Sequence, residues 1–341
     1  MSTLSMIGIG VLALGGFVIV HAFVQNPRIF TQVLVTGLSN GALYALIALG
    51  YTMVYGIIEL INFAHGDLFM LGSVFSAIFL EEWLNQTRSS PAGWFWLAIT
   101  LIVIMAGCAL LNVTIEFLAY RRLRNAPKLA PLITAVGVSF ILQNFGILLN
   151  GSAPNSRQSV MPKVLEGAQM VDRTISIGAI EIRVKYLFVL AVTIPLLLLM
   201  TYIVQKTRTG KAMRATAQDR DASALMGINV DRIISFTFAL GGALAGAAGV
   251  LFVQVNEVTR YDAGFRLGLI AFTAAVLGGV GNLLGAVVGG VLIGVIQNLN
   301  DSNLGYFIGQ KWTQTVTFSI LILMIIFRPG GIFGKHQVEK V

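Results

Sequence analysis

Charged side chains are scarce in this 341-residue sequence, at 11% of residues, whereas 56% are hydrophobic. Because soluble domains carry about 25% charged residues, this composition excludes an ordinary soluble fold. The mean hydropathy of +0.82 indicates a polytopic membrane protein. A net charge of +8 would suggest nucleic-acid binding in a soluble chain, but here the basic residues lie mostly in short loops between apolar runs. There they are expected to orient the chain and contact lipid headgroups, so we expect no nucleic-acid partner.

Cysteine and histidine are also rare. The single cysteine, Cys108, lies inside an apolar run, which excludes an intrachain disulfide and favours a role as a small hydrophobic side chain. The three histidines, His21, His65 and His336, are far apart in the sequence. We therefore expect no metal site.

A Walker A loop, which would hold nucleotide phosphates, is absent as well. Its lysine must be followed by Ser or Thr. The two Gly-Lys pairs, at 210–211 and 334–335, are followed instead by Ala212 and His336. We expect no catalytic residues, no enzymatic activity and no cofactor bound by this chain.

Long apolar runs are what the sequence has in abundance. Since about 20 apolar residues are needed to cross a bilayer as a helix, they predict an all-α polytopic membrane protein with a bundle of about 8–10 transmembrane segments in one domain, 1–341. The candidate spans are Met6–Val24, Phe30–Leu49, a polar-interrupted Tyr51–Leu80, Gly93–Val113, Ala130–Leu149, Tyr186–Val204, Ile233–Val253, Leu267–Leu283, Leu284–Leu299 and Thr313–Phe327.

The first run, Met6–Val24, could instead be a cleaved secretory signal. It has no Lys or Arg before its apolar stretch and no clear small-residue cleavage site. We therefore favour a retained extra N-terminal helix at 6–24.

Basic residues predict the orientation of the bundle. More than half of the 23 Lys and Arg lie in Leu118–Leu129, in Gln205–Arg232 and in the tail after Phe327. This excess places the three segments in the cytoplasm. The loop at 150–185 is then external, and its stretch TISIGAIEIRV, at 174–184, predicts a small β-hairpin.

One apolar segment, near 51–80, carries polar residues at membrane depth: Glu59, Asn62, His65, Gly66 and Asp67. A charged side chain there costs roughly 2.5–3.5 kcal/mol, so it must face protein or a wet path. We interpret the segment as a discontinuous helix, in which Gly66 turns the backbone and a half-helix beginning near Asp67 faces a substrate route. Alternatively, Asn62 and Asp67 only cap two half-helices, and His65 is hydrogen-bonded in the bundle.

Glycines recur at helical spacing toward the C-terminal end, where the helix pair near 267–299 is rich in them. Repeats of this kind let helices approach closely. The predicted packing residues are Gly242, Gly246, Gly281, Gly285 and Gly289, with Gly290 and Gly294 on a neighbouring stripe. A glycine-rich, interrupted segment in each half is also typical of transporters built from two related halves, although no residue-by-residue repeat is visible.

A polar, Ala-rich stretch, Thr207–Arg232, lies between two apolar spans and has little to bury against within the chain. It favours a docking element for a soluble partner, within a cytoplasmic coupling segment at 205–232, and Gly227 is placed to end its helix at Met226. The residues predicted to serve coupling are Arg214, Ala217, Asp219, Asp221, Ala224 and Gly227.

These blocks, in this order, resemble one family, the branched-chain amino-acid permeases of ABC importers (LivH type). The similarity extends from about Phe30 to the C-terminus and includes NGALYALIALGYTMVYGIIELINFAHGDLFMLGS, YRRLRNAPKLAPLITAVGVSFILQN, the polar stretch, AFTAAVLGGVGNLLGAVVGGVLIGVIQ and the ending RPGGIFGKHQVEKV. The extra apolar run before Phe30 departs from the shortest family pattern.

The resemblance implies a bacterial inner-membrane permease subunit for leucine, isoleucine and valine. Its implied partners are a second related permease, two cytoplasmic ATPase subunits that bind ATP, and a periplasmic substrate-binding protein. Urea or short amides are alternative substrates within the same family. A proton-coupled secondary transporter that uses Glu59, His65 and Asp67 is an alternative of another class, and a channel or scaffold would not need a docking segment.

Overall fold

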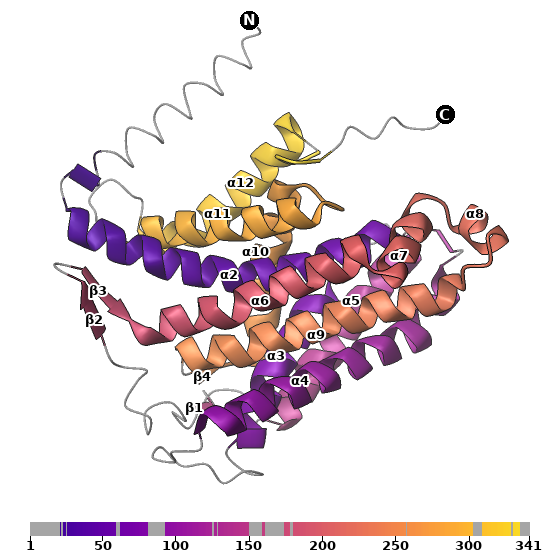
Figure 1. Ribbon diagram of the computed structural model, residues 1–341, viewed down its shortest axis with the longest axis horizontal. Coiled ribbons are helices and arrows are strands. Elements are labelled where there is room, and N and C mark those ends of the chain that lie inside the picture. The colour runs from indigo at the N-terminus through magenta and orange to yellow at the C-terminus, as the bar shows by residue number, and fades with distance from the viewer. Residues whose placement is uncertain are drawn as a thin grey trace, which may run out of the picture.

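The computed structural model describes residues 21, 23–24, 26–58, 62–80, 93–124, 126–127, 129–149, 159–160, 174–177, 180–256, 258–302, 309–328 and 330–334. These residues form a bundle of long helices (Figure 1). The α-helices are α2 (Pro27–Ile58), α3 (Ala64–Ile78), α4 (Gly93–Ile115), α5 (Leu129–Leu149), α6 (Val184–Lys206), α7 (Arg208–Gln218), α8 (Arg220–Leu225), α9 (Val230–Asn256), α10 (Ala263–Gly278), α11 (Leu283–Asp301) and α12 (Thr313–Phe327). The shorter elements are a π-helical turn η2 (Glu116–Tyr120), the 3-10 turns η3 (Arg121–Leu123) and η4 (Gln310–Trp312), and the strands β1 (Ser159–Val160), β2 (Thr174–Ile177), β3 (Ile180–Arg183) and β4 (Val258–Thr259).

Seven of the described helical segments are long and apolar enough to cross a membrane. They are α2, 95–123, α5, α6, α9, α11 and 310–327. The apolar helices α3 and α10, of 15 and 16 residues, are shorter than the roughly 20 residues that a crossing needs. The expected all-α polytopic membrane fold is confirmed. The expected span Met6–Val24 lies outside the described residues, apart from positions 21, 23 and 24.

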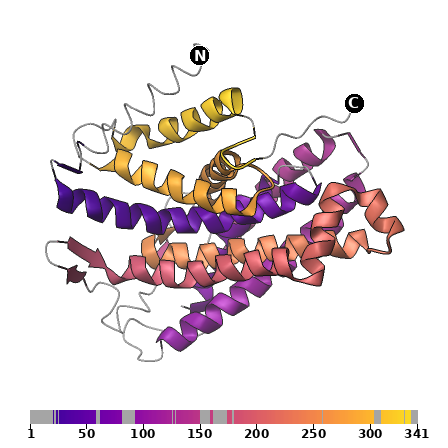
Figure 2. The same ribbon diagram turned by 45° about the horizontal axis from the view of Figure 1, so that its top comes forward.

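The bundle has two different ends. The β2–β3 hairpin lies at one end and α7–α8 projects from the other, in both views (Figures 1 and 2). The hairpin is antiparallel, with Thr174 opposite Arg183, and it lies within the stretch for which the sequence predicts one. At the α7–α8 end, Arg124 forms an ion pair with Asp231 in the first turn of α9. The basic segment after α4 and the polar stretch therefore lie at the same end.

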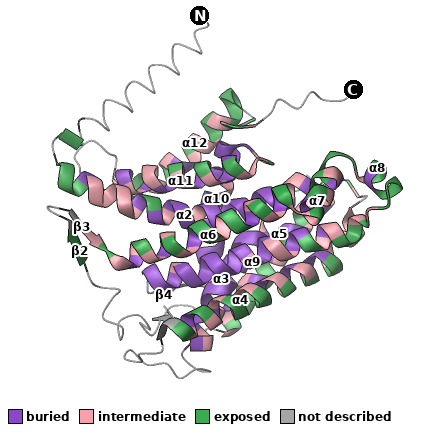
Figure 3. Ribbon diagram, viewed as in Figure 1, coloured by how far each residue is buried: buried purple, intermediate pink, exposed green. Residues whose placement is uncertain are grey.

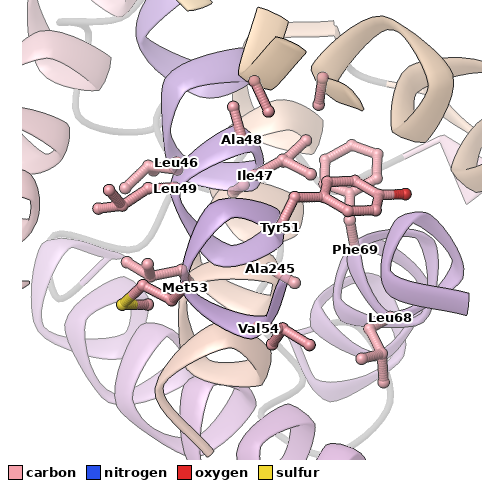
Figure 4. Packing of buried hydrophobic residues seen from close by; sticks show 14 of the residues in the cluster. Leu46, Ile47, Ala48, Leu49, Tyr51, Met53, Val54, Leu68, Phe69 and Ala245 are labelled. Carbon is pink, nitrogen blue, oxygen red and sulfur yellow. The ribbon is translucent and has the colours of Figure 1, made fainter. Parts of the chain in front are cut away.

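The buried centre consists mainly of α2, α3 and α9 (Figure 3). Most spanning residues of α2 and α9 are buried by other helices, whereas Thr317 is the only residue of α12 that is fully buried among the described residues. Figure 4 shows part of this cluster, in which Leu46 and Val54 of α2 join Phe69 of α3 and Ala245 of α9. Because α2 is enclosed on most sides, apolar residues surround its axis instead of forming a single stripe.

Glycines lie where helices pack most closely. Gly242 and Gly246 of α9 face α4, and a Cβ added at Gly246 would lie 2.9 Å from the carbonyl oxygen of Ile104. Gly285 and Gly289 of α11 face α10. On the neighbouring stripe of α11, Gly290 and Gly294 lie against α2.

Gly281 departs from the expected packing stripe. It lies in the turn between α10 and α11 with φ of +90°, and no atom lies within 4 Å of the place that its Cβ would take. Glycine is favoured there because other residues rarely adopt positive φ. Helix α10 ends at Gly278, a few residues before Leu283, where the sequence predicts the end of the corresponding span.

The structure describes α2 as far as Ile58 and α3 from Ala64, with residues 62 and 63 outside both helices, and α2 continues unbroken through Gly50, where the sequence separated two spans. The turn expected at Gly66 is wrong, because Gly66 lies in the first turn of α3. Its small size serves close packing instead. A Cβ there would lie 2.8 Å from the Cα of Gly268 in α10.

The described helices fall into two groups with matching contacts, α2 to α5 and α9 to α12. α2 packs most extensively against α11, and α9 against α4, while α3 packs on α9 and α10 on α2. α2 runs toward the α7–α8 end and α9 runs away from it, so the two groups have opposite directions. This is the arrangement of an inverted repeat. The short helices α3 and α10 occupy corresponding places and meet near their first turns.

Candidate functional site

The start of α3 brings polar side chains into the centre of the bundle. Asn62 is 5% exposed, and His65 and Asp67 are fully buried. The turn into the helix is closed by the N–H of His65, which donates to the carbonyl of Asn62 at 3.1 Å. Glu59, which the sequence groups with these residues, lies outside the described part of the chain.

Asp67 is held by α5, a helix that follows it by more than sixty positions in the sequence. The hydroxyl of Ser139 donates to one carboxylate oxygen, and the Gln143 amide donates to the other at 3.2 Å. Ser139 and Gln143 lie one helical turn apart and contact each other at 3.2 Å. A carboxylate in this position has two neutral donors and no cation among its described hydrogen-bond partners, so its charge is solvated only by dipoles.

Asn62 is fixed from α4. Its side-chain oxygen accepts a hydrogen bond of 2.7 Å from the Tyr120 hydroxyl in η2. The N-cap position of α3 is Phe63, which makes no capping bond through its side chain. Asn62 and Asp67 are therefore not the simple helix caps of the alternative interpretation.

His65 lies against α2. Its ring packs beside Gly50 and makes an edge contact with Tyr51, with the ring centroids 4.7 Å apart. Within the described residues, neither ring nitrogen has a hydrogen bond of normal geometry, although the Ile47 carbonyl is near. Gly50 has to be small because His65 occupies the space that a side chain would need.

Together these contacts join α2, α3, α4 and α5 around one polar cluster. Because Asn62, His65 and Asp67 are all buried, the conformation is closed at the first turn of α3. A substrate route along these residues would require α3 to separate from α5 or α10. Their role in a route stays a prediction.

The polar stretch 207–232 forms two helices, α7 and α8, and not one. Asp219 separates them with extended backbone, and its carboxylate accepts from the N–H of Ala222 at 2.9 Å as the N-cap of α8. Gly227 follows the helix with φ of +81°. The N–H of Gly227 donates to Ala224 at 3.0 Å, and that of Ile228 to Ser223 at 3.1 Å, the pattern of a Schellman C-cap.

All six predicted coupling residues are exposed on this element: Arg214, Ala217, Asp219, Asp221, Ala224 and Gly227. The Arg214 guanidinium also donates to the carbonyl of Val204 in α6. These contacts anchor the base of the projection and leave its tip free of the described chain.

α8 is tied to the same region of the bundle as the polar cluster. The Arg220 guanidinium donates to the carbonyl of Ile57 at 2.8 Å, in the last turn of α2. That turn immediately precedes residues 59–63 and α3. A displacement of α8 would therefore act on the end of α2.

Comparison with known proteins agrees with this architecture. Residues 33–327 match the family described as the permease component of branched-chain amino acid transport systems. The chain belongs to this family. It is 38% identical to the high-affinity branched-chain amino acid permease LivH of Escherichia coli K12 and 39% identical to BraD of Pseudomonas aeruginosa, in each case over 92% of this chain and 98% of the relative. A probable LivH of Methanocaldococcus jannaschii is 25% identical over 86% of this chain and 89% of the relative.

This permease is therefore a multi-pass inner-membrane protein of an amino-acid transport family. Its spanning helices and its named relatives support the same conclusion. The relatives are components of transport systems by name.

The permease also contains a buried charge cluster that the sequence did not suggest. Glu116 is fully buried in η2, where one carboxylate oxygen pairs with Arg124 and Arg121, and the other accepts from the Ser235 hydroxyl at 2.7 Å. Arg124 also bonds to Asp231. The cluster clamps the end of α4 to the start of α9. The signal in the sequence was a lone acid in an apolar run with arginines five and eight residues later.

A second missed feature lies at the tip of α8. Leu225 and Met226 are 89% and 84% exposed, although both are large apolar residues. They follow Ala224 and precede the Gly227 cap, so the end of the projection presents an apolar surface. Such a surface on a water-facing element is typical of a docking site.

Proposed function

We propose that this chain is the permease subunit of an ATP-driven importer that moves leucine, isoleucine and valine across the bacterial inner membrane. One observation carries the proposal: a permease of this family projects a short, doubly capped helix with an exposed apolar tip, α8, which is hydrogen-bonded to the last turn of α2. Such an element could transmit a conformational change from a soluble partner to the membrane-spanning helices.

The proposed partners of α7–α8 are two cytoplasmic ATPase subunits. The apolar pair Leu225 and Met226 would enter a groove on one ATPase, while Asp219 and Asp221 would remain at its polar rim. ATP would be bound by the partners and not by this chain. A second, related permease and a periplasmic substrate-binding protein would complete the assembly.

The substrate class follows from physical chemistry as well as from the names of the relatives. A branched-chain amino acid has two charged ends that cannot enter hydrocarbon unsolvated, together with an apolar side chain. A route between the polar cluster and the apolar helices would accept both the charged ends and the apolar side chain. Asn62, His65 and Asp67 are the proposed polar residues of this route, with Glu59 and Gly66 beside them in the sequence.

The test is transport in proteoliposomes that contain the complete assembly, with and without ATP, across a panel of leucine, isoleucine, valine, urea and acetamide. We expect uptake of the three amino acids to be at least tenfold above that of urea or acetamide. This uptake should occur only when ATP is present on the side of the membrane that carries the ATPase subunits. Preferred uptake of urea or acetamide would overturn the assignment of branched-chain amino acids as the substrate, while the assignment as an ATP-driven importer would stand. Uptake that is abolished by an uncoupler at constant ATP would favour the proton-coupled alternative.

A further inference from the structure

Arg266 is an exposed arginine in the first turn of α10, on an otherwise apolar helix. Within the described part of the chain it has no ion pair and no hydrogen bond through its side chain. Both of its neighbours on the exposed face, Phe265 and Leu269, are apolar, and Phe265 is 51% exposed. A permanent positive charge between apolar side chains needs water or a polar group beside it.

The depth of Arg266 follows from its neighbours. A Cβ at Gly264 would lie 2.7 Å from the backbone oxygen of Gly66 and 2.8 Å from a carboxylate oxygen of Asp67. The first turn of α3 in turn lies beside Gly241, near the middle of α9. The first turn of α10 is therefore near the middle of the bundle, where a charge facing lipid would be strongly unfavourable.

The inverted arrangement gives Arg266 a counterpart. Asp67 is the fourth residue of α3 and Arg266 the fourth residue of α10, counted from the first residues of these helices, Ala64 and Ala263. One position carries an acid that turns inward to Ser139, and the other carries a base that turns outward. The two halves thus place opposite charges at corresponding positions in the bundle.

The surroundings of Arg266 match one kind of ligand. Tyr44 of α2 lies within electrostatic range of the Arg266 guanidinium and of Asp301. Arginine binds carboxylates through two parallel hydrogen bonds, and Phe265 and Leu269 offer apolar contacts beside it. A carboxylate attached to a branched aliphatic chain satisfies both parts.

We propose that Arg266 receives the carboxylate of the amino-acid substrate on the face of α10 that borders the transport route. This inference deepens the proposed function and depends on it. Phe265 and Leu269 contact the aliphatic side chain.

The first experiment compares Arg266→Gln, Arg266→Lys and the matched control Arg260→Gln in the complete reconstituted assembly. Arg260 is an exposed arginine that pairs with Asp262 outside the helices, at 2.9 Å. We expect leucine uptake to fall at least tenfold in Arg266→Gln, to stay within about threefold in Arg266→Lys, and to be unchanged in Arg260→Gln. Basal ATPase activity and the composition of the purified assembly should not change in any variant.

The second experiment separates charge from packing. Arg266→Cys is made in a Cys108→Ala background and treated with a thiol reagent that adds an aminoethyl group or with one that adds a sulfonatoethyl group. The positive adduct should restore at least a third of leucine uptake, and the negative adduct should restore none. Cys108→Ala with Arg266 intact, treated in the same way, controls for thiols on partner subunits.

The outcomes separate this inference from the proposed function. Leucine uptake by the unaltered assembly decides the proposed function by itself. If that uptake is present and Arg266→Gln transports leucine normally, only the carboxylate assignment is overturned. Loss of the second permease from the Arg266→Gln assembly would also overturn it, because Arg266 would then pair with a protein acid at the subunit interface. Equal restoration by both adducts would show that bulk and not charge is required.

Discussion

At the scale of single residues, the permease holds its two buried carboxylates, Asp67 and Glu116, by hydrogen bonds and ion pairs from other parts of the chain. Asp67 has only neutral donors, Ser139 and Gln143, whereas Glu116 has two arginines and a serine. A buried carboxylate without a cation is poorly compensated, so a neutral isostere in its place avoids the cost of burying a charge. Retaining such a group points to function more than to stability.

Asp67→Asn tests this difference. The substitution removes the buried charge and keeps the size and one acceptor oxygen, so we expect the thermal midpoint of the purified assembly to be unchanged or higher. Leucine uptake should fall at least tenfold if Asp67 serves the route. The control Ser139→Ala removes one hydrogen bond and should cost about 1 kcal/mol of stability. Normal uptake by Asp67→Asn would assign Asp67 to structure alone.

At the scale of elements, α8 owes its shape to local sequence and its position to the bundle. The Asp219 cap and the Schellman motif at Gly227 fix its two ends. Arg220 then attaches it to α2 through the carbonyl of Ile57. Because the helix is only six residues long, it is too short to be stable alone and depends on these contacts.

Enlarging an exposed alanine on this element should block docking without disturbing the membrane part. We expect Ala224→Trp, and to a lesser degree Ala217→Trp, to lower substrate-stimulated transport at least tenfold, because an indole would not fit a groove shaped for a methyl group. Basal ATP hydrolysis should persist and be uncoupled from uptake. Ala106→Trp, on an exposed face of α4, is the matched control and should transport normally. Coupled transport by Ala224→Trp would refute docking at this face.

At the scale of the whole molecule, the two inverted groups of helices place α3 and α10 as a pair in the centre and leave different structures at the two ends. The β2–β3 hairpin lies at one end, and the buried clamp of Glu116 and Arg124 lies at the other, next to α8. The excess of Lys and Arg predicts that the α8 end lies in the cytoplasm.

Labelling from one side checks this orientation. In a Cys108→Ala background, Ser176→Cys in β2 should react with a membrane-impermeant thiol reagent added to intact spheroplasts. Ala222→Cys in α8 should react only after the spheroplasts are opened. Both positions are exposed, so a difference in labelling reports sidedness and not burial. The reverse pattern would invert the orientation and place α8 outside.

The sequence alone determined the features that depend on local interactions and on composition. The apolar runs gave the membrane class because bilayer thickness sets their length. The C-terminal end of α8 was visible because a left-handed glycine and its cap bonds involve residues only a few positions apart. The motif blocks identified the family for the same reason, since each is a continuous stretch.

Only the tertiary structure decided which polar residues meet. Asn62 and Tyr120 are 58 positions apart, and Asp67 and Ser139 are 72 apart, so their contacts depend on how whole helices pack. The same holds for Gly66, which reads as a hinge in the sequence but lies within α3 because α10 approaches it. Arg266 was also hidden in the sequence. Its importance comes from the depth and exposure that the packing of α10 on α3 gives it, and periodicity alone does not carry that information.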